Sequence, residues 1–321
     1  MTASGRGRFR AVLGGVVTLL LFLAVTGPLR RSLAPVAVDA GDGEVGEVVA
    51  ARELSDVGTT APAAFEGPAR LPDDDPDGTR TNRTWFAAGQ WWAILDAGGS
   101  AGGAAHIWRL TGEAGPWEDT GVLVDDRPFA EPWVAWTGSE LVVASTGSRT
   151  YRSHGLQVNR FTWDAARRNW VRSADFPVRV TQAGAPGTQL VVDREGRAWL
   201  ARQEGAGVLV ASSDADKLSF GPFAPLPDGQ AAADVGSFSL TLGDAGPQIA
   251  WRSATTDQLA VTSHRDGAWS TERVVAHGVG GSGVVQAAPA GPSRPGALLV
   301  VVASSLPQRG SNDQDPSVLL L

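Results

Sequence analysis

Residues 159–173, "NRFTWDAARRNWVRS", contain two tryptophans, Trp163 and Trp170, on either side of a polar segment with the composition of a turn. Apolar and polar side chains alternate around this segment, which is typical of a β-hairpin. Comparable hairpins recur at residues 106–124, 207–226 and 258–275. A hairpin that returns along the chain indicates a repeat fold.

Two landmarks of the repeat share one period. The second strand of each hairpin opens with an aromatic residue, and these residues are 53, 50 and 49 positions apart: Trp117, Trp170, Phe220 and Trp269. Each hairpin is preceded by two more apolar runs around a glycine-containing turn, and their first strands are 49, 56 and 50 positions apart, at Trp85, Val134, Leu190 and Leu240. A four-stranded unit of about 50 residues predicts an all-β protein, a β-propeller of four-stranded blades, because such a unit buries both faces only against its neighbours.

About five blades are visible in the sequence. Four units cover residues 82–128, 129–180, 181–232 and 233–279, and a fifth contains "GVVQAAPAG", "GALLVVVASS" and "SVLLL" as its strands. Residues 43–53, "GEVGEVVAARE", alternate as a strand does and would complete the fifth blade of a closed ring. The alternative is an incomplete larger ring, in which this chain is the front of a longer protein.

The repeated tryptophans have two interpretations. Because they recur at one position of each unit, we expect them to cover the junction between adjacent blades. The alternative is a platform for sugar rings, since exposed aromatic faces bind sugars.

Composition narrows the function classes. The chain has no cysteine, which excludes disulfides, thiolate metal sites and a cysteine nucleophile. Its net charge is −7, and five arginines lie within the first 31 residues, so the remainder is more acidic still. An acidic surface argues against nucleic acid as a partner. No motif predicts a bound cofactor.

The first residues have the pattern of an export segment. Three arginines precede an uncharged run of 19 residues, from Ala11 to Leu29, which is long enough to span a bilayer as a helix. We therefore predict a signal anchor or signal peptide at 1–31, a flexible linker at 32–81 and a β-propeller domain at 82–321. Retention of the helix gives a single-pass membrane protein with its bulk extracellular, and cleavage gives a secreted one.

The outer turns resemble degenerate copies of the Asp box, the Ser-x-Asp-x-Gly-x-x-Trp turn of sialidase-like (BNR-repeat) propellers. The stretches are "TGEAGPW" (111–117), "SSDADKLSF" (212–220) and "SHRDGAW" (263–269). The resemblance implies a turn between the third and fourth strands of each blade. In the enzymes of that superfamily it also implies a tyrosine nucleophile with a glutamate and three arginines. Here Tyr151 is the only tyrosine, and no partner glutamate can be assigned.

One loop concentrates candidate ligand-binding residues. The stretch 145–158 is the longest break between a second and a third strand, and it contains Arg149, Tyr151, Arg152 and His154. Such loops and inter-blade connections such as 125–131 commonly line the mouth of a propeller, where ligands bind. Tyr151 is the candidate catalytic residue, and a solvated surface loop is the alternative.

A weak calcium candidate lies in the linker. Asp73, Asp75 and Asp77 precede Gly78 as in the first half of a calcium loop, but Thr84 stands where the bidentate Glu belongs. A solvated acidic linker is the alternative.

The leading functional hypothesis is a binding or interaction module at the cell surface, for a glycan or another exported protein, with the membrane contacted only through the N-terminal helix. The alternative is a sialidase-like glycoside hydrolase or lyase with its site in the propeller mouth.

Overall fold

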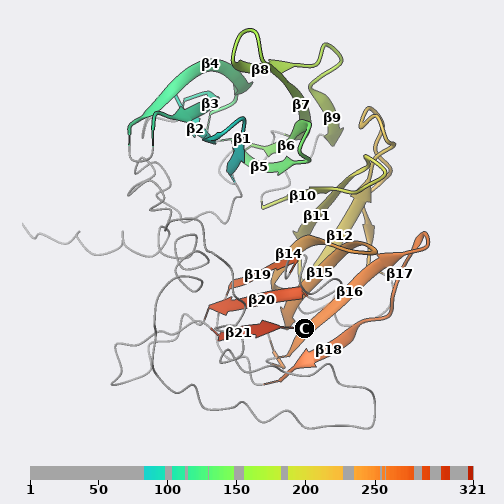
Figure 1. Ribbon diagram of the computed structural model, residues 1–321. Coiled ribbons are helices and arrows are strands. Elements are labelled where there is room, and N and C mark those ends of the chain that lie inside the picture. Colours follow the sequence, from blue (N-terminus) through green and yellow to red (C-terminus); the bar gives the residue numbers. More distant parts are fainter. Residues whose placement is uncertain are drawn as a thin grey trace, which may run out of the picture.

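The computed structural model describes residues 83–97, 103–112, 115–128, 130–147, 155–181, 187–226, 235–253, 255–256, 258–277, 284–289, 298–303 and 317–320. Their regular structure consists of β-strands in five antiparallel sheets that follow one another in chain order (Figure 1). The predicted β-propeller is confirmed, with each sheet forming one blade. No helix among these residues is long and apolar enough to cross a membrane. The predicted export helix, the linker and the strand at 43–53 lie outside the described residues.

The blades correspond to the sequence units. Blade 1 contains β1 (Thr84–Ala87), β2 (Gln90–Asp96), β3 (Ala105–Leu110) and β4 (Trp117–Asp125). Blade 2 contains β5 (Glu131–Trp136), β6 (Glu140–Thr146), β7 (Leu156–Asp164), β8 (Asn169–Arg172) and β9 (Val178–Thr181). Blade 3 contains β10 (Gln189–Val192), β11 (Ala198–Glu204), β12 (Gly207–Ser212) and β13 (Ala224–Pro225).

Two further blades complete the described part. Blade 4 contains β14 (Val235–Gly243), β15 (Gly246–Ser253), β16 (Leu259–Arg265), β17 (Ala268–Trp269) and β18 (Arg273–Ala276). Blade 5 contains β19 (Val284–Pro289), β20 (Leu298–Ala303) and β21 (Ser317–Leu320), which confirms the three strands predicted for it. In blades 2 and 4 the outer strand is interrupted, so that two short strands pair with the third strand.

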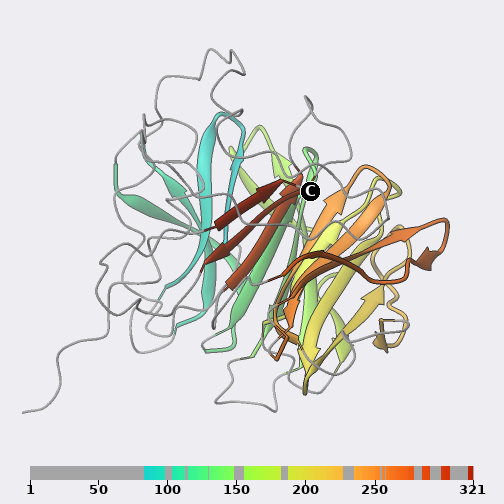
Figure 2. The same cartoon turned by 90° about the horizontal axis from the view of Figure 1, so that it is seen from below.

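Polar side chains join the innermost strands of neighbouring blades. The Gln189 amide group donates to the carbonyl oxygen of Phe238 and accepts from the amide of Leu240, across 3.0 and 2.6 Å. Between blades 4 and 5, the hydroxyls of Ser237 and Ser239 accept hydrogen bonds from backbone amides of β19. These bonds satisfy strand-edge groups that would otherwise lack partners. Figure 2 shows the result, with β19–β21 beside the strands of blade 4.

The chain's single lysine also ties two blades together. Lys217 lies in the outer turn of blade 3, and its buried ammonium group pairs with the Glu140 carboxylate of blade 2 across 2.6 Å. Arg160, on β7, donates to the carbonyl oxygen of Asp216 in the same turn. The junction between blades 2 and 3 is therefore polar at its outer end.

The junction between blades 1 and 2 is packed with tryptophan. Trp163 and Trp170 are cross-strand neighbours on β7 and β8, and their rings contact Trp92 of blade 1 with centroids 5.3 and 5.7 Å apart. Trp170 also packs against Trp85 and Trp136, 5.8 and 5.3 Å away. At this junction the packing interpretation of the repeated tryptophans is confirmed.

Candidate functional site

The predicted mouth lies at the blade face where inter-blade connections meet the loops between second and third strands. Arg127, in the connection 125–131, is held by the buried carboxylate of Asp125, with 2.6 Å between nitrogen and oxygen. The Arg127 guanidinium also donates to the carbonyl oxygens of Ser145 and Gly155. These two residues belong to the described ends of the candidate loop 145–158, before and after its candidate residues. The connection and the flanks of that loop therefore do lie together.

The candidate residues themselves are not placed. Arg149, Tyr151, Arg152 and His154 lie outside the described residues, as do Asp73, Asp75 and Asp77. Their ligand-binding, catalytic and calcium-binding roles stay predictions.

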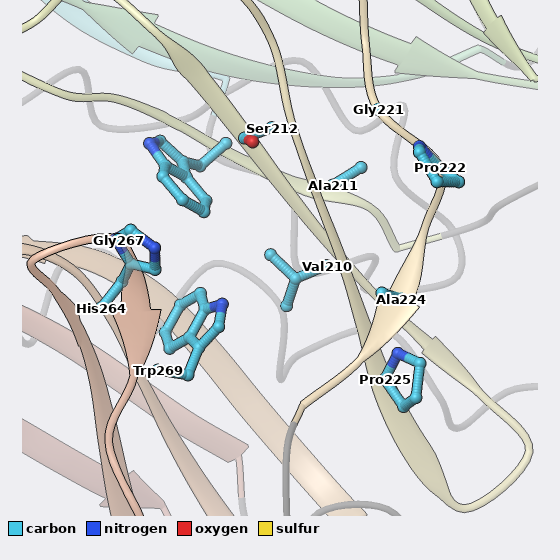
Figure 3. A pocket seen from close by; sticks show the side chains of 11 residues that line it. Val210, Ala211, Ser212, Gly221, Pro222, Ala224, Pro225, His264, Gly267 and Trp269 are labelled. Atoms are coloured by element: carbon cyan, nitrogen blue, oxygen red, sulfur yellow. The ribbon is translucent and has the colours of Figure 1, made fainter.

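A pocket of about 340 Å³ opens at the outer end of the junction between blades 3 and 4 (Figure 3). Trp199, His264 and Trp269 form an aromatic wall, and Pro222, Ala224 and Pro225 lie on the opposite side. The remaining lining residues are Val210, Ala211, Ser212, Gly221 and Gly267. The volume is near the lower end of the range for small-molecule sites, so the pocket accommodates a small ligand or one end of a larger ligand.

This pocket occupies the place that tryptophans fill between blades 1 and 2. Trp199, His264 and Trp269 correspond in strand position to Trp92, Trp163 and Trp170, because Trp269 pairs with His264 as Trp170 pairs with Trp163. The ring contacts are also similar, with 4.4 Å from Trp199 to His264, 5.4 Å from His264 to Trp269 and 5.9 Å from Trp199 to Trp269.

Smaller side chains stand at three of the corresponding positions, of which His264 lines the pocket, while Leu240 belongs to the core of this junction and Val191 packs against that core. Strand pairing places Val191 opposite Trp199, where blade 1 has Trp85 opposite Trp92. Leu240 lies beside Ile249 in blade 4, where blade 2 has Trp136 beside Leu141. With His264 in place of Trp163, three of the five tryptophans of the first junction have smaller counterparts. Lost ring volume leaves a cavity when the surroundings do not collapse.

Charged groups outside the lining hold Trp199 in place. Its indole N–H donates to the Asp193 carboxylate across 2.7 Å, and that carboxylate is buried. Arg197 donates to the same carboxylate across 3.1 Å, and its guanidinium lies 5.7 Å from the Trp199 ring centre. Trp199 is therefore held in place before any ligand arrives, which lowers the entropy cost of binding against its ring.

His264 is neutral in this environment at neutral pH. Desolvation by burial lowers its pKa below the usual 6.5, and the nearby Arg197 charge acts in the same direction. A backbone hydrogen bond with Gly267 and the charge of Asp193 oppose this shift. The lowered pKa means that the unfolded chain binds a proton at a higher pH than the folded protein does.

The His264 shift predicts a pH-dependent stability. The contribution of His264 is fully present above pH 6.5 and is lost as the pH falls through its lower folded-state pKa. We expect the melting temperature to fall between about pH 7.5 and pH 5, and to fall less in His264→Gln. Thermal unfolding followed by circular dichroism measures both curves. Identical pH dependence in the two proteins would contradict the assignment.

Three outer turns of the sequence analysis can be located between strands. "TGEAGPW", "SSDADKLSF" and "SHRDGAW" each lie between the third strand and the outer strand of a blade. The last two contribute Ser212, His264, Gly267 and Trp269 to the pocket. The sequence therefore identified these turns and their aromatic residue, but it did not distinguish a filled junction from an open one.

No family model matches the sequence, and no curated protein matches it. Among solved structures, the α-L-arabinofuranosidase Arb93A of Fusarium graminearum has a TM-score of 0.45 and 13% identity, covering 75% of this chain and 74% of that chain.

Two further solved structures are similar in fold. The RS223 β-xylosidase has a TM-score of 0.40 and 12% identity, over 74% of this chain and 90% of its own. Zg3597, a family 117 glycoside hydrolase of Zobellia galactanivorans, has a TM-score of 0.39 and 15% identity, over 74% and 82% of the two chains. At these identities the likeness is one of fold.

Proposed function

We propose that this protein is a carbohydrate-binding β-propeller whose binding site is the pocket between blades 3 and 4. The observation that carries the proposal is the aromatic wall of Trp199, His264 and Trp269 beside a pocket whose described lining residues carry no permanent charge. A sugar ring has C–H groups that pack on an aromatic face and hydroxyls that need partners at the edge of the pocket. Ser212 and the His264 ring supply such partners.

The proposed setting is outside the cytoplasm. The basic, then uncharged N-terminal segment motivates export, with the propeller tethered to the membrane or secreted. A glycan of a cell surface or of the surrounding medium is the proposed partner. The partial Asp-box pattern of the outer turns motivates a distant relation to sialidase-like propellers.

The test is binding to a panel of soluble polysaccharides by affinity electrophoresis, with xylan, arabinan, galactan, mannan, polygalacturonate and alginate as probes. We expect at least one to retard the protein, and Trp269→Ala to weaken that interaction by about tenfold or more, as expected for an aromatic anchor. Trp91→Ala, which removes a half-buried tryptophan of blade 1, is the matched control and should bind as the unmodified protein does. Retardation by none of the polysaccharides, or equal retardation of Trp269→Ala, would reject this site.

Glycoside hydrolysis in the mouth is the second candidate. The connection 125–131 begins with the carboxylate of Asp125 and ends with that of Glu131, which accepts a hydrogen bond from the Gly187 amide of the next connection across 3.1 Å. Glycosidases usually use two carboxyl groups about 5–10 Å apart, so this candidate requires Asp125 and Glu131 to form such a pair. Release of reducing ends from the same polysaccharides tests this candidate. A polysaccharide that is bound but not cleaved would count against it and leave the binding proposal standing.

A further inference from the structure

The pocket-lining residues that the structure describes include no permanently charged side chain. None of these eleven residues is Asp, Glu, Lys or Arg. Their single titratable group, His264, has a pKa lowered by burial and is therefore neutral at neutral pH. A ligand that enters meets rings, aliphatic carbons, a hydroxyl and backbone groups (Figure 3).

The charged groups that contact Trp199 from outside the lining are already paired with each other. The Asp193 carboxylate accepts hydrogen bonds from the Trp199 indole and from Arg197. The second carboxylate near Arg197 is that of Glu195, 3.6 Å from the guanidinium. Redirecting Arg197 to an anionic ligand would break its bond to Asp193, which is buried, and an uncompensated buried carboxylate is costly.

This arrangement discriminates between neutral and acidic sugars. The carboxylate of a uronic or sialic acid would lose water on entering and would find no cation among the lining residues. The hydroxyls of a neutral sugar can exchange water for Ser212, His264 and backbone groups at little cost. Stacking on the Trp269 ring is available to both classes and does not separate them.

Resting on the proposed function, we infer that the pocket between blades 3 and 4 selects neutral sugar units and rejects those that carry a carboxylate. The selectivity originates in the uncharged lining, and the pairing of Arg197 with Asp193 keeps the guanidinium beside Trp199 from binding the ligand.

The experiment compares matched ligands at about pH 7.5 by isothermal titration of the full-length protein: xylo-oligosaccharides with their glucuronate-substituted forms, and galacto-oligosaccharides with oligogalacturonates. We expect the neutral member of a pair to bind about tenfold or more tightly. Ser212→Arg, which adds a cation to the lining, should narrow or reverse the preference, whereas Ser212→Gln, of similar length and uncharged, should not.

The outcomes separate the two proposals. Tighter binding of the acidic member, lost in Trp269→Ala, would overturn the neutral selectivity and keep the site. Equal binding of both members, again lost in Trp269→Ala, would also overturn the neutral selectivity and keep the site. Binding that Trp269→Ala leaves unchanged, or no binding of any probe, would remove the proposed site and this inference with it.

Discussion

Trp170→Ala lowers the free energy of unfolding by about 3–5 kcal/mol, the range for removing a buried aromatic side chain. Trp170 is only 2% exposed, and its ring contacts four other tryptophans: Trp85, Trp92, Trp136 and Trp163. Since small domains are stable by about 5–15 kcal/mol, the change removes a large share of the total. Chemical denaturation followed by tryptophan fluorescence and by circular dichroism measures the loss.

Two variants serve as controls for this prediction. Trp170→Phe keeps a ring and deletes an indole N–H that is buried and has no hydrogen-bond partner among the described residues, so we expect a much smaller loss. Trp269→Ala removes the counterpart in blade 4, which is half-buried beside the pocket, and should also cost less. A loss for Trp170→Ala no greater than that for Trp269→Ala would contradict the idea that tryptophan packing joins blades 1 and 2.

The repeat could be predicted from the sequence because its signal is local. Each outer hairpin places a large aromatic residue after a short polar turn, so these residues mark successive blades without any knowledge of the pairing: Trp117, Trp170, Phe220 and Trp269. Strand alternation and turn residues within one unit are sufficient to indicate four strands.

The pocket could not be predicted in the same way, because it depends on smaller side chains that replace tryptophan at positions far apart in the sequence. Trp269 has the same sequence signature as Trp170, yet one lines a hollow and the other is buried. The two junctions differ at His264, which lines the pocket, and at Val191 and Leu240 in the neighbouring core; the three residues lie in three strands of two blades. Only the strand pairing shows that these residues stand where the first junction has tryptophan.

At the propeller mouth, the arrangement of the loops could be predicted from the sequence, but the contacts that hold them could not. The arrangement could be predicted because connections and second-to-third loops leave the same edge of each blade. Arg127 was not singled out within the connection 125–131, since a surface arginine in a polar loop gives no signal of the Asp125 and Ser145 contacts that hold it. The roles of Tyr151 and its neighbours remain predictions.

His264→Trp is expected to close the pocket and to weaken polysaccharide binding by about 100-fold or more, equivalent to roughly 2.7 kcal/mol. Blade 2 already has a tryptophan at the position of His264. This residue, Trp163, packs between Trp92 and Trp170, with ring centres 5.3 and 5.5 Å away. The larger ring should fill the hollow and bury apolar area, so the melting temperature should stay level or rise. Affinity electrophoresis and thermal unfolding measure the two effects on one preparation.

Loss of binding without loss of stability distinguishes closure of the site from damage to the fold. His264→Ala, which removes the ring and leaves the pocket open, should retain more affinity than His264→Trp, because Trp199 and Trp269 still provide their aromatic faces. If His264→Trp folds and binds as the unmodified protein does, the ligand occupies another part of the molecule. In that case the mouth, where Arg127 holds both flanks of the candidate loop, becomes the site to test next.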